Sequence, residues 1–255
     1  MLLVWPLGDD GPPGTRPLAT VALICVCTGA SLWLWSLPAD AAEGALRWLG
    51  VIPADLTEHG RYGIEPSLRL APLSSLVLHA GWAHLLINLA YLWLFGRGLE
   101  AALGHWRLLL LFVAAGIVGE FAQIVAVPTS PLPMIGASGG VAGVLGAYLL
   151  RYPRANILTL AILWRRSLVV RVPALLVIGL WLLAEFASLG PADAGHGGDA
   201  SFAHLGGFAA GLLLAPLLRT PGQGLFQPAR SAAFSSAPWS SSRPRGRERS
   251  ASSGS

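Results

Sequence analysis

Charged residues are scarce in this sequence. Only 12% of its 255 residues are charged, whereas 54% are hydrophobic and the mean hydropathy is +0.60. This composition disfavours a water-soluble domain, which needs a larger share of polar surface residues. Because every backbone polar group in lipid must be satisfied within its own segment, we expect an all-α polytopic membrane protein with one helical domain.

Lysine is absent, so all 17 basic residues are arginines. With a cytoplasmic N-terminus, most of them lie on the cytoplasmic side, where positive residues collect. Only three lie outside, on a long first loop: Arg47, Arg61 and Arg69. The arginine pattern therefore predicts an N-in/C-in topology. The net charge of +4 follows largely from these flanks and the C-terminal tail, so we expect no nucleic-acid partner.

Only two cysteines occur, and Cys25 and Cys27 stand two residues apart in the first apolar run. Residues at this spacing point to different faces of a helix, which fits neither a disulfide framework nor a metal site. We expect two thiols that face the core or the lipid, and no cofactor.

Long apolar runs dominate the rest of the chain. Six of them approach the length needed to cross about 30 Å of hydrocarbon. They are residues 18–37, 73–96, 108–127, 137–151, 168–188 and 202–218. We therefore predict a cytoplasmic segment over 1–17, a six-helix domain over 18–218 and a cytoplasmic tail over 219–255.

The two ends of the chain need separate interpretations. Arg16 and the ADA at 39–41 are compatible with a signal peptide, but the first apolar run is longer than such peptides usually have, which favours a retained helix. The tail is rich in Ser, Pro, Gly and Arg and is predicted to be disordered. In the first loop, GALRWLGVI is amphipathic and suits either the membrane interface or ordinary loop packing.

Polar side chains within membrane segments are costly and are therefore functional candidates. The second segment contains His79, His84 and Asn88. His84 and Asn88 are four apart and share a helix face, whereas His79 is rotated well away from His84. No carboxylate completes a zinc pattern, so we expect no metal. Hydrogen bonding between helices is the alternative for each of these residues, above all for His79.

Glycines spaced four apart line the fourth and sixth segments, and such strips allow helices to pack closely. They are Gly139 and Gly143 in the fourth segment, and Gly207 and Gly211 in the sixth. Contact along the strips would bring Ser138 and His204 to the same depth, as nucleophile and base. The orphan N–H groups at the start of the fourth helix, with His84 and Asn88, are candidate oxyanion donors.

The fourth segment is also short. From Gly136 to Leu150 it spans about 22 Å, less than the hydrocarbon slab, so its outer end is expected below the membrane surface. Irregular backbone at that depth is tolerated only inside protein or beside water. The sequence therefore predicts a recessed, hydrated pocket with Ser138 at its floor.

No acid evidently completes a catalytic triad. Asp193 and Asp199 precede the sixth segment and suit a solvated loop. Glu120 and Glu185 lie within the third and fifth segments without an evident partner, so the sequence predicts a Ser–His dyad without them.

Three motifs stand in order on three of the expected helices: HAGWAHLLIN (79–88), GASG (136–139) and AHLGGFAAG (203–211). Together they resemble the rhomboid family of intramembrane serine proteases over about residues 18–218. FGRGLEAALGH (95–105) resembles the family as well. The resemblance implies a six-helix bundle with Ser138 as nucleophile and His204 as general base. It also implies oxyanion donors and supporting residues, which are His84 and Asn88, and Gly136, Gly139, Gly207, Gly211 and His79.

Two features depart from the family pattern. Leu70 and Ala71 stand where some rhomboids have a Trp-Arg pair, and Ala142 stands where some members place an aromatic ring against the catalytic histidine. These departures concern the positioning of the first loop and the imidazole. The reacting groups themselves are all present.

The function that we predict is intramembrane proteolysis of transmembrane protein substrates in the lipid bilayer, without a metal. A noncatalytic rhomboid-like scaffold that binds transmembrane helices is the alternative, although such a protein would be expected to lose Ser138 or His204. A small ion transporter would require paired inverted halves, which the sequence lacks. We expect a multi-pass protein of a bacterial plasma membrane, with an organellar inner membrane left open.

Overall fold

The computed structural model describes residues 2–9, 16–59, 66–163, 166–189, 200–219 and 224–226, most of which are helical. The first part of the chain forms β1 (Leu2–Asp9), α1 (Leu18–Ser36), α2 (Ala39–Leu49), α3 (Pro53–His59), α4 (Pro66–Ser74), the short helix η1 (Ser75–Val77), α5 (Trp82–Tyr91), the π-helix η2 (Leu92–Gly96) and α6 (Arg97–Leu103). The second part forms α7 (His105–Ala126), α8 (Ser138–Arg151), β2 (Asn156–Leu163), β3 (Arg166–Pro173), α9 (Ala174–Ala187) and α10 (Ser201–Leu218).

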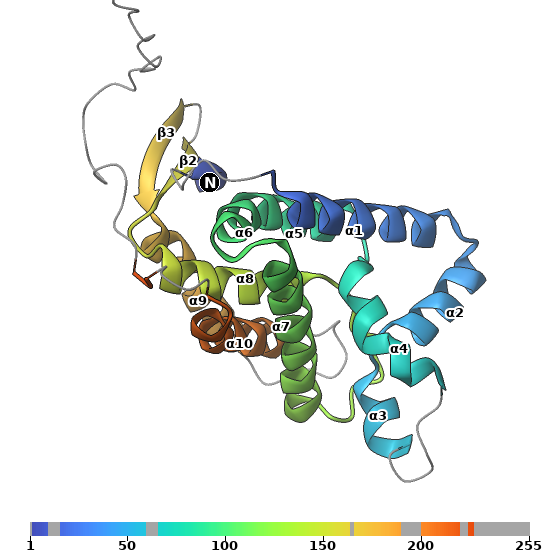
Figure 1. Ribbon diagram of the computed structural model, residues 1–255. Coiled ribbons are helices and arrows are strands. Elements are labelled where there is room, and N and C mark those ends of the chain that lie inside the picture. Colours follow the sequence, from blue (N-terminus) through green and yellow to red (C-terminus); the bar gives the residue numbers. More distant parts are fainter. Residues whose placement is uncertain are drawn as a thin grey trace, which may run out of the picture.

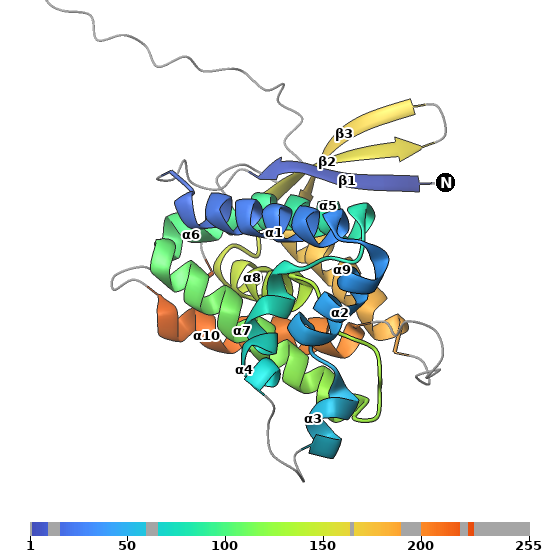
Figure 2. The same ribbon diagram turned by 90° about the vertical axis from the view of Figure 1, so that its right-hand side faces the viewer.

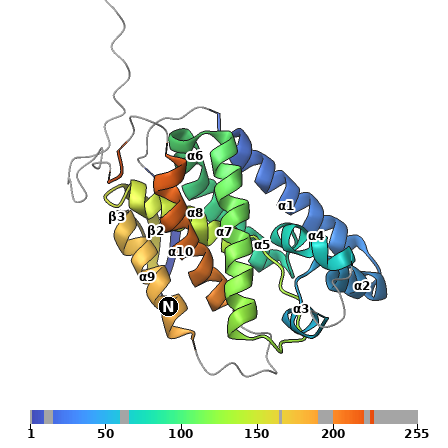
Figure 3. The ribbon, with the colours of Figure 1, turned by 60° about the horizontal axis from the view of Figure 1, so that its bottom comes forward.

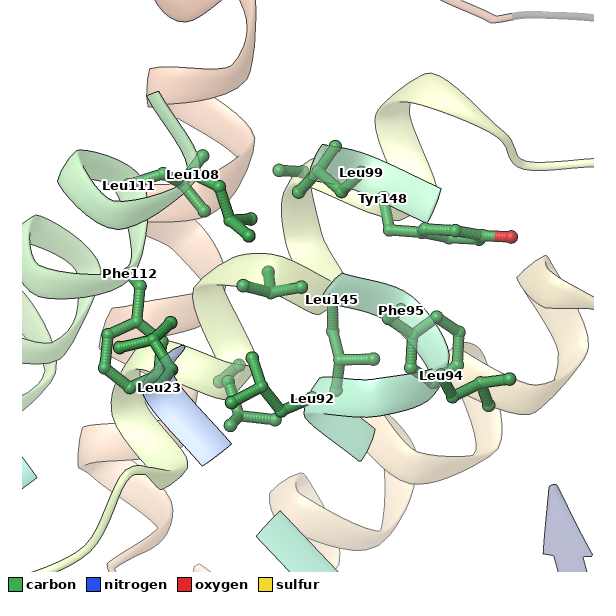
Figure 4. Close-up of a cluster of buried hydrophobic side chains, with 14 of the residues drawn as sticks. Leu23, Leu92, Leu94, Phe95, Leu99, Leu108, Leu111, Phe112, Leu145 and Tyr148 are labelled. Atoms are coloured by element: carbon green, nitrogen blue, oxygen red, sulfur yellow. The ribbon is translucent and has the colours of Figure 1, made fainter. Parts of the chain in front are cut away.

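Helix α8 is the centre of the helical bundle, with α1, α5, α7, α9 and α10 arranged around it (Figures 1 and 2). Every residue of α8 from Gly139 to Tyr148 is buried. Its large side chains meet apolar residues of α1, η2, α6 and α7 in one cluster, in which the rings of Tyr148 and Phe95 lie 5.0 Å apart (Figure 4). The burial of α8 therefore fixes the position of its first residue, Ser138.

Four of the predicted segments are observed as helices within three residues of their expected bounds: α1, α7, α8 and α10. Three of these four, all except α8, are long and apolar enough to cross a membrane. A bent pair of helical segments, Leu70–Val77 and Trp82–Leu103, adds a fourth candidate span. Within the described ranges, length and composition therefore do not confirm the predicted six spans, since α8 and α9 have 14 residues each.

The second predicted segment, 73–96, is not one continuous helix. It breaks between Val77 and Trp82, and the helical parts on either side of the break meet at 90°. Leu78 and Gly81 in the break have extended backbone, which ends one helix and starts the next. The expectation that His79 and His84 belong to one helix, and point well apart, is therefore wrong.

The expectation of an all-α chain is also corrected, because β1, β2 and β3 form an antiparallel sheet in that order beside the bundle (Figure 2). In the fifth predicted segment, 168–188, a helix begins only at Ala174. Pro173 restrains the preceding residue to extended backbone. Residues 168–172, which precede Pro173, are rich in β-branched valine, and this favours a strand. A short apolar run does not distinguish a strand from a buried helix.

The first loop and the tail are described in part. In the loop, the amphipathic stretch belongs largely to α2, whose Trp48 is 66% exposed. Most of the tail predicted to be disordered lies outside the described residues. Its residues 224–226 contact the end of α8, where Phe226 N–H donates to the carbonyl of Leu150 at 3.1 Å and the Arg151 guanidinium donates to the carbonyl of Gly224.

Candidate active site

Ser138 is the first residue of α8, and the loop before it is held by backbone hydrogen bonds. Met134 pairs with Val51 through bonds of 2.7 and 3.1 Å. Gly136 N–H donates to the carbonyl of Ser75 at 2.9 Å, two residues before Ser138. This irregular segment is therefore fixed to the first loop and to η1, and the half-buried Ser138 side chain is presented from a defined position.

Gly136 brings the loop against His84. Its φ of +135° lies in a region that side chains rarely adopt, so the turn requires glycine. A β-carbon at Gly136 would lie 2.7 Å from both Cε1 and Nε2 of His84, and 3.6 Å from Oγ of Ser138. The imidazole of His84 and the hydroxyl of Ser138 thus border the same glycine.

His204 lies in the first turn of α10, which packs directly on α8 and α7 (Figure 3). A β-carbon at Gly207 would come within 2.1 Å of the carbonyl oxygen of Gly139, so the two helices meet backbone to backbone. Gly139 follows Ser138, and Gly207 is one turn after His204. A β-carbon at Gly139 would also lie 3.7 Å from the carbonyl oxygen of Ala203, so the first turn of α8 lies beside the first turn of α10, as the glycine strips predict.

Within the described part of the chain, no hydrogen bond joins Ser138 to His204. In unliganded hydrolases the bond between nucleophile and base is often long and tightens only with substrate. The roles of the two residues remain predictions at this point.

His204 has a partner that the sequence prediction missed. Its Nδ1 lies 2.9 Å from Oε2 of Glu185 on α9. The ring of Trp181, one turn earlier on α9, lies 6.2 Å from the imidazole. The sequence showed no evident partner for Glu185, and the structure supplies one. The energetic cost of placing a carboxylate in an apolar helix indicates that a partner exists, but it does not indicate which residue the partner is.

His79 is fully buried in the break before α5 and connects three parts of the structure. Its Nδ1 lies 3.0 Å from the hydroxyl of Ser31 on α1, and its Nε2 accepts from the N–H of Ala137 at 3.4 Å. Because Nε2 accepts, Nδ1 carries the proton and donates to Ser31. Its ring also meets that of His84, with centroids 5.0 Å apart. These contacts favour the structural alternative for His79.

Asn88 lies one turn after His84 on α5 and is buried. Its side-chain N–H donates to the carbonyl of His84 at 2.9 Å, which ties the two predicted oxyanion donors to one helix face. Of the two, the structure brings His84 next to the loop of Ser138.

Two polar residues of α7 hold the backbone near the predicted reacting groups. The carboxylate of Glu120 accepts from the hydroxyl of Ser75, whose carbonyl receives Gly136 N–H. Gln123 accepts from the N–H of Ala203, beside His204, at 3.1 Å. The sequence showed no evident partner for Glu120, and the structure gives it Ser75. The spacing of three residues, which puts both polar groups on one face of α7, was the available signal.

Other predicted features of the site are not located by the structure. A cavity lies at the opposite end of α8, between Arg151 and Arg219. This cavity is not the hydrated pocket expected around Ser138, which stays a prediction. Asp193 and Asp199 lie outside the described residues. Among the residues described, no three His, Cys, Asp or Glu side chains group as metal ligands.

A comparison with known protein families identifies residues 70–221 as a Rhomboid domain, which is more than half of the chain. The chain belongs to the rhomboid family. With its long apolar helices, this membership makes it an integral membrane protein.

Similar rhomboid proteins occur in bacteria and plants. In Bacillus subtilis (strain 168), Rhomboid protease GluP is 47% identical over 77 residues, covering 30% of this chain and 15% of that protein. Putative rhomboid protease YdcA of the same organism is 40% identical over 79 residues, covering 30% and 38%. RHOMBOID-like protein 5 of Arabidopsis thaliana is 30% identical over 166 residues, covering 65% and 49%. The chain thus aligns with less than half of each of these relatives.

Proposed function

We propose that this rhomboid is an intramembrane serine endopeptidase that hydrolyses peptide bonds in or near transmembrane segments of other membrane proteins. The observation that carries the proposal is the backbone contact between Gly139 and Gly207, because it adjoins Ser138 and lies one turn from His204. The names of the two bacterial relatives, both given as rhomboid proteases, point to the same chemistry.

In this mechanism Ser138 and His204 act as nucleophile and general base. His204 takes the proton of the Ser138 hydroxyl while Oγ attacks the scissile carbonyl carbon. The tetrahedral intermediate collapses with cleavage of the C–N bond, and the imidazolium returns the proton to the leaving amine. Water, activated by the same imidazole, then hydrolyses the acyl-enzyme and releases the carboxylate.

The oxyanion of the tetrahedral intermediate requires hydrogen-bond donors. The first N–H groups of α8 have no carbonyl one turn earlier within the helix, so the N–H of Ser138 is a natural donor. The position of His84 beside Gly136 supports a second donor from its side chain. Asn88, one turn further along α5, is proposed as the third.

The proposed substrate is a transmembrane helix that unwinds near the bond to be cleaved. A helical peptide hides its carbonyls within its own hydrogen bonds, so small or helix-breaking residues near the scissile bond would lower the cost of exposing one. We propose that α5, α8 and α9 also cross or enter the membrane, in a six-segment N-in/C-in arrangement with the protease domain over 18–218. A bacterial plasma membrane is our proposal for its location, although the relatives come from both a bacterium and a plant.

The test is cleavage of a model transmembrane substrate by the purified full-length chain in detergent. Ser138→Ala and His204→Ala should each lower kcat by about a thousandfold or more, with the thermal unfolding temperature unchanged. A fluorophosphonate probe should label the wild type and not Ser138→Ala. Equal cleavage by either variant would refute the dyad. A wild type that binds the substrate helix without cleaving it would instead support the scaffold alternative.

A further inference from the structure

We propose that Glu185 is a positioning residue for His204, which extends the pair of Ser138 and His204 to a Ser–His–Glu arrangement; this inference rests on the proposed function. The carboxylate Oε2 of Glu185 lies 2.9 Å from Nδ1 of His204. The two residues come from different helices, α9 and α10, so the contact is a tertiary one and not a consequence of helical spacing.

The contact determines which imidazole nitrogen can act as base. An ionised carboxylate only accepts hydrogen bonds, so Nδ1 of His204 must carry the proton. In the neutral ring the lone pair then resides on Nε2, which is the atom that must take the proton of Ser138. Without Glu185 the ring could adopt the other tautomer and rotate about its side chain.

The negative charge of the Glu185 carboxylate also complements the positive charge that His204 acquires during catalysis. When His204 becomes an imidazolium, the negative charge of Glu185 is in contact with it. The exposed fractions of the two side chains are 21% for His204 and 16% for Glu185, so water screens the pair only in part. Glu185 should therefore stabilise the transition state more than the ground state, which is the condition for an effect on kcat.

Beside Glu185, the hydroxyls of Ser188 on α9 and Ser201 on α10 lie 2.7 Å apart and join the same two helices. Ala142 on α8 has no ring to place against the imidazole, whereas α9 brings both the Glu185 carboxylate and the ring of Trp181 close to it.

A purely structural role is the competing explanation. Near its end, α9 is largely exposed, with Leu183 and Phe186 uncovered, and the bond to His204 could simply attach α9 to α10. The Ser188–Ser201 bond is a second attachment of the same two helices and does not involve His204. Ser188→Ala is therefore a matched control, because it weakens the attachment and leaves the imidazole its partner.

The experiment measures kcat, KM and thermal unfolding for Glu185→Gln, Glu185→Ala and Ser188→Ala in the full-length chain. Both Glu185 variants should lower kcat by about 10²- to 10⁴-fold with KM nearly unchanged, as expected when the tautomer is lost. Glu185→Gln keeps the size of the side chain and controls for folding. Ser188→Ala should stay within about twofold of the wild type. Glu185 variants with wild-type kcat, or with losses that only parallel those of Ser188→Ala, would overturn the inference.

A spectroscopic measurement gives an answer that does not depend on turnover. Nitrogen-15 NMR of histidine-labelled wild type, with His204→Ala used for assignment, should show His204 protonated at Nδ1. Protonation at Nε2 instead would overturn the inference even if the variants misfold. A wild type that neither cleaves substrate nor reacts with the fluorophosphonate refutes the proposed function and this inference together, whereas an active wild type with an unaffected Glu185→Gln refutes the inference alone.

Discussion

The carbonyl oxygen of Gly139 on α8 lies so close to Cα of Gly207 on α10 that a β-carbon at Gly207 would approach it to 2.1 Å. The same relationship recurs one turn later, where a β-carbon at Gly211 would lie 2.0 Å from the carbonyl oxygen of Gly143. No side chain fits between the helices at either level. The separation of Ser138 and His204, which adjoin the first contact, therefore depends on glycine in this strip.

Gly207→Ala should drive α10 away from α8. The new methyl group would meet the backbone of Gly139, which cannot move aside cheaply, so we expect a loss of about 1–3 kcal/mol in stability and loss of fluorophosphonate labelling at Ser138. Gly179→Ala on α9 is the matched control, because the added β-carbon would have open space around it, with no described neighbour within 4 Å. It should leave the thermal unfolding temperature equal or slightly raised. Similar behaviour of the two variants would contradict the close packing of α8 and α10.

Gly136→Ala should disturb the site more than the fold. The methyl group would meet the His84 ring at 2.7 Å, and a φ of +135° is unfavourable for alanine. We expect kcat for the model substrate to fall at least tenfold, with a stability loss of about 1–3 kcal/mol. Gly81→Ala is the control, since Gly81 has extended backbone and open space around its β-carbon. Full activity of Gly136→Ala would show that the turn tolerates a side chain.

The sequence predicts helices well wherever an apolar run is long and uninterrupted, as in α1, α7 and α10. It fails at residues 78–81, because a buried polar break such as that at His79 is stabilised by partners from α1 and from the loop before Ser138. It fails again at 168–173, the start of the fifth predicted segment, where these residues pair with β2 as a strand although the run is apolar enough for a helix. The first failure concerns contacts between segments distant in the chain, and the second concerns the pairing of two strands that follow each other.

The candidate site follows the same division. The close packing of α8 on α10 could be predicted from sequence, because glycine spacing indicates which helix faces meet. The partners of Glu185 and Glu120 could not, since a carboxylate in an apolar helix signals only that some partner exists. The rotation of α9 about its axis, which aims Glu185 at His204, depends on packing that no local pattern encodes.

His79→Ala should act through stability and not through chemistry. The variant removes an acceptor for Ala137 N–H and a partner for Ser31, so both groups lose buried hydrogen bonds at a cost of about 1–3 kcal/mol each. Ser31→Ala is the partial control, because it removes only the Nδ1 contact and should cost less. Fluorophosphonate labelling should decline only as far as the folded fraction declines. A fully folded His79→Ala that is catalytically dead would instead assign His79 to the reaction.

Asn88→Ala should lower kcat by about 10²- to 10³-fold while KM stays near that of the wild type, because an oxyanion donor acts only in the transition state. Asn88 is buried one turn from His84, so its side chain is positioned before substrate arrives. Ile87→Ala, the exposed neighbour on the same helix, is the control and should leave kcat unchanged. Kinetics with the model transmembrane substrate, run beside thermal unfolding, separate the two effects. A rise in KM at constant kcat would show that Asn88 binds substrate and does not stabilise the oxyanion.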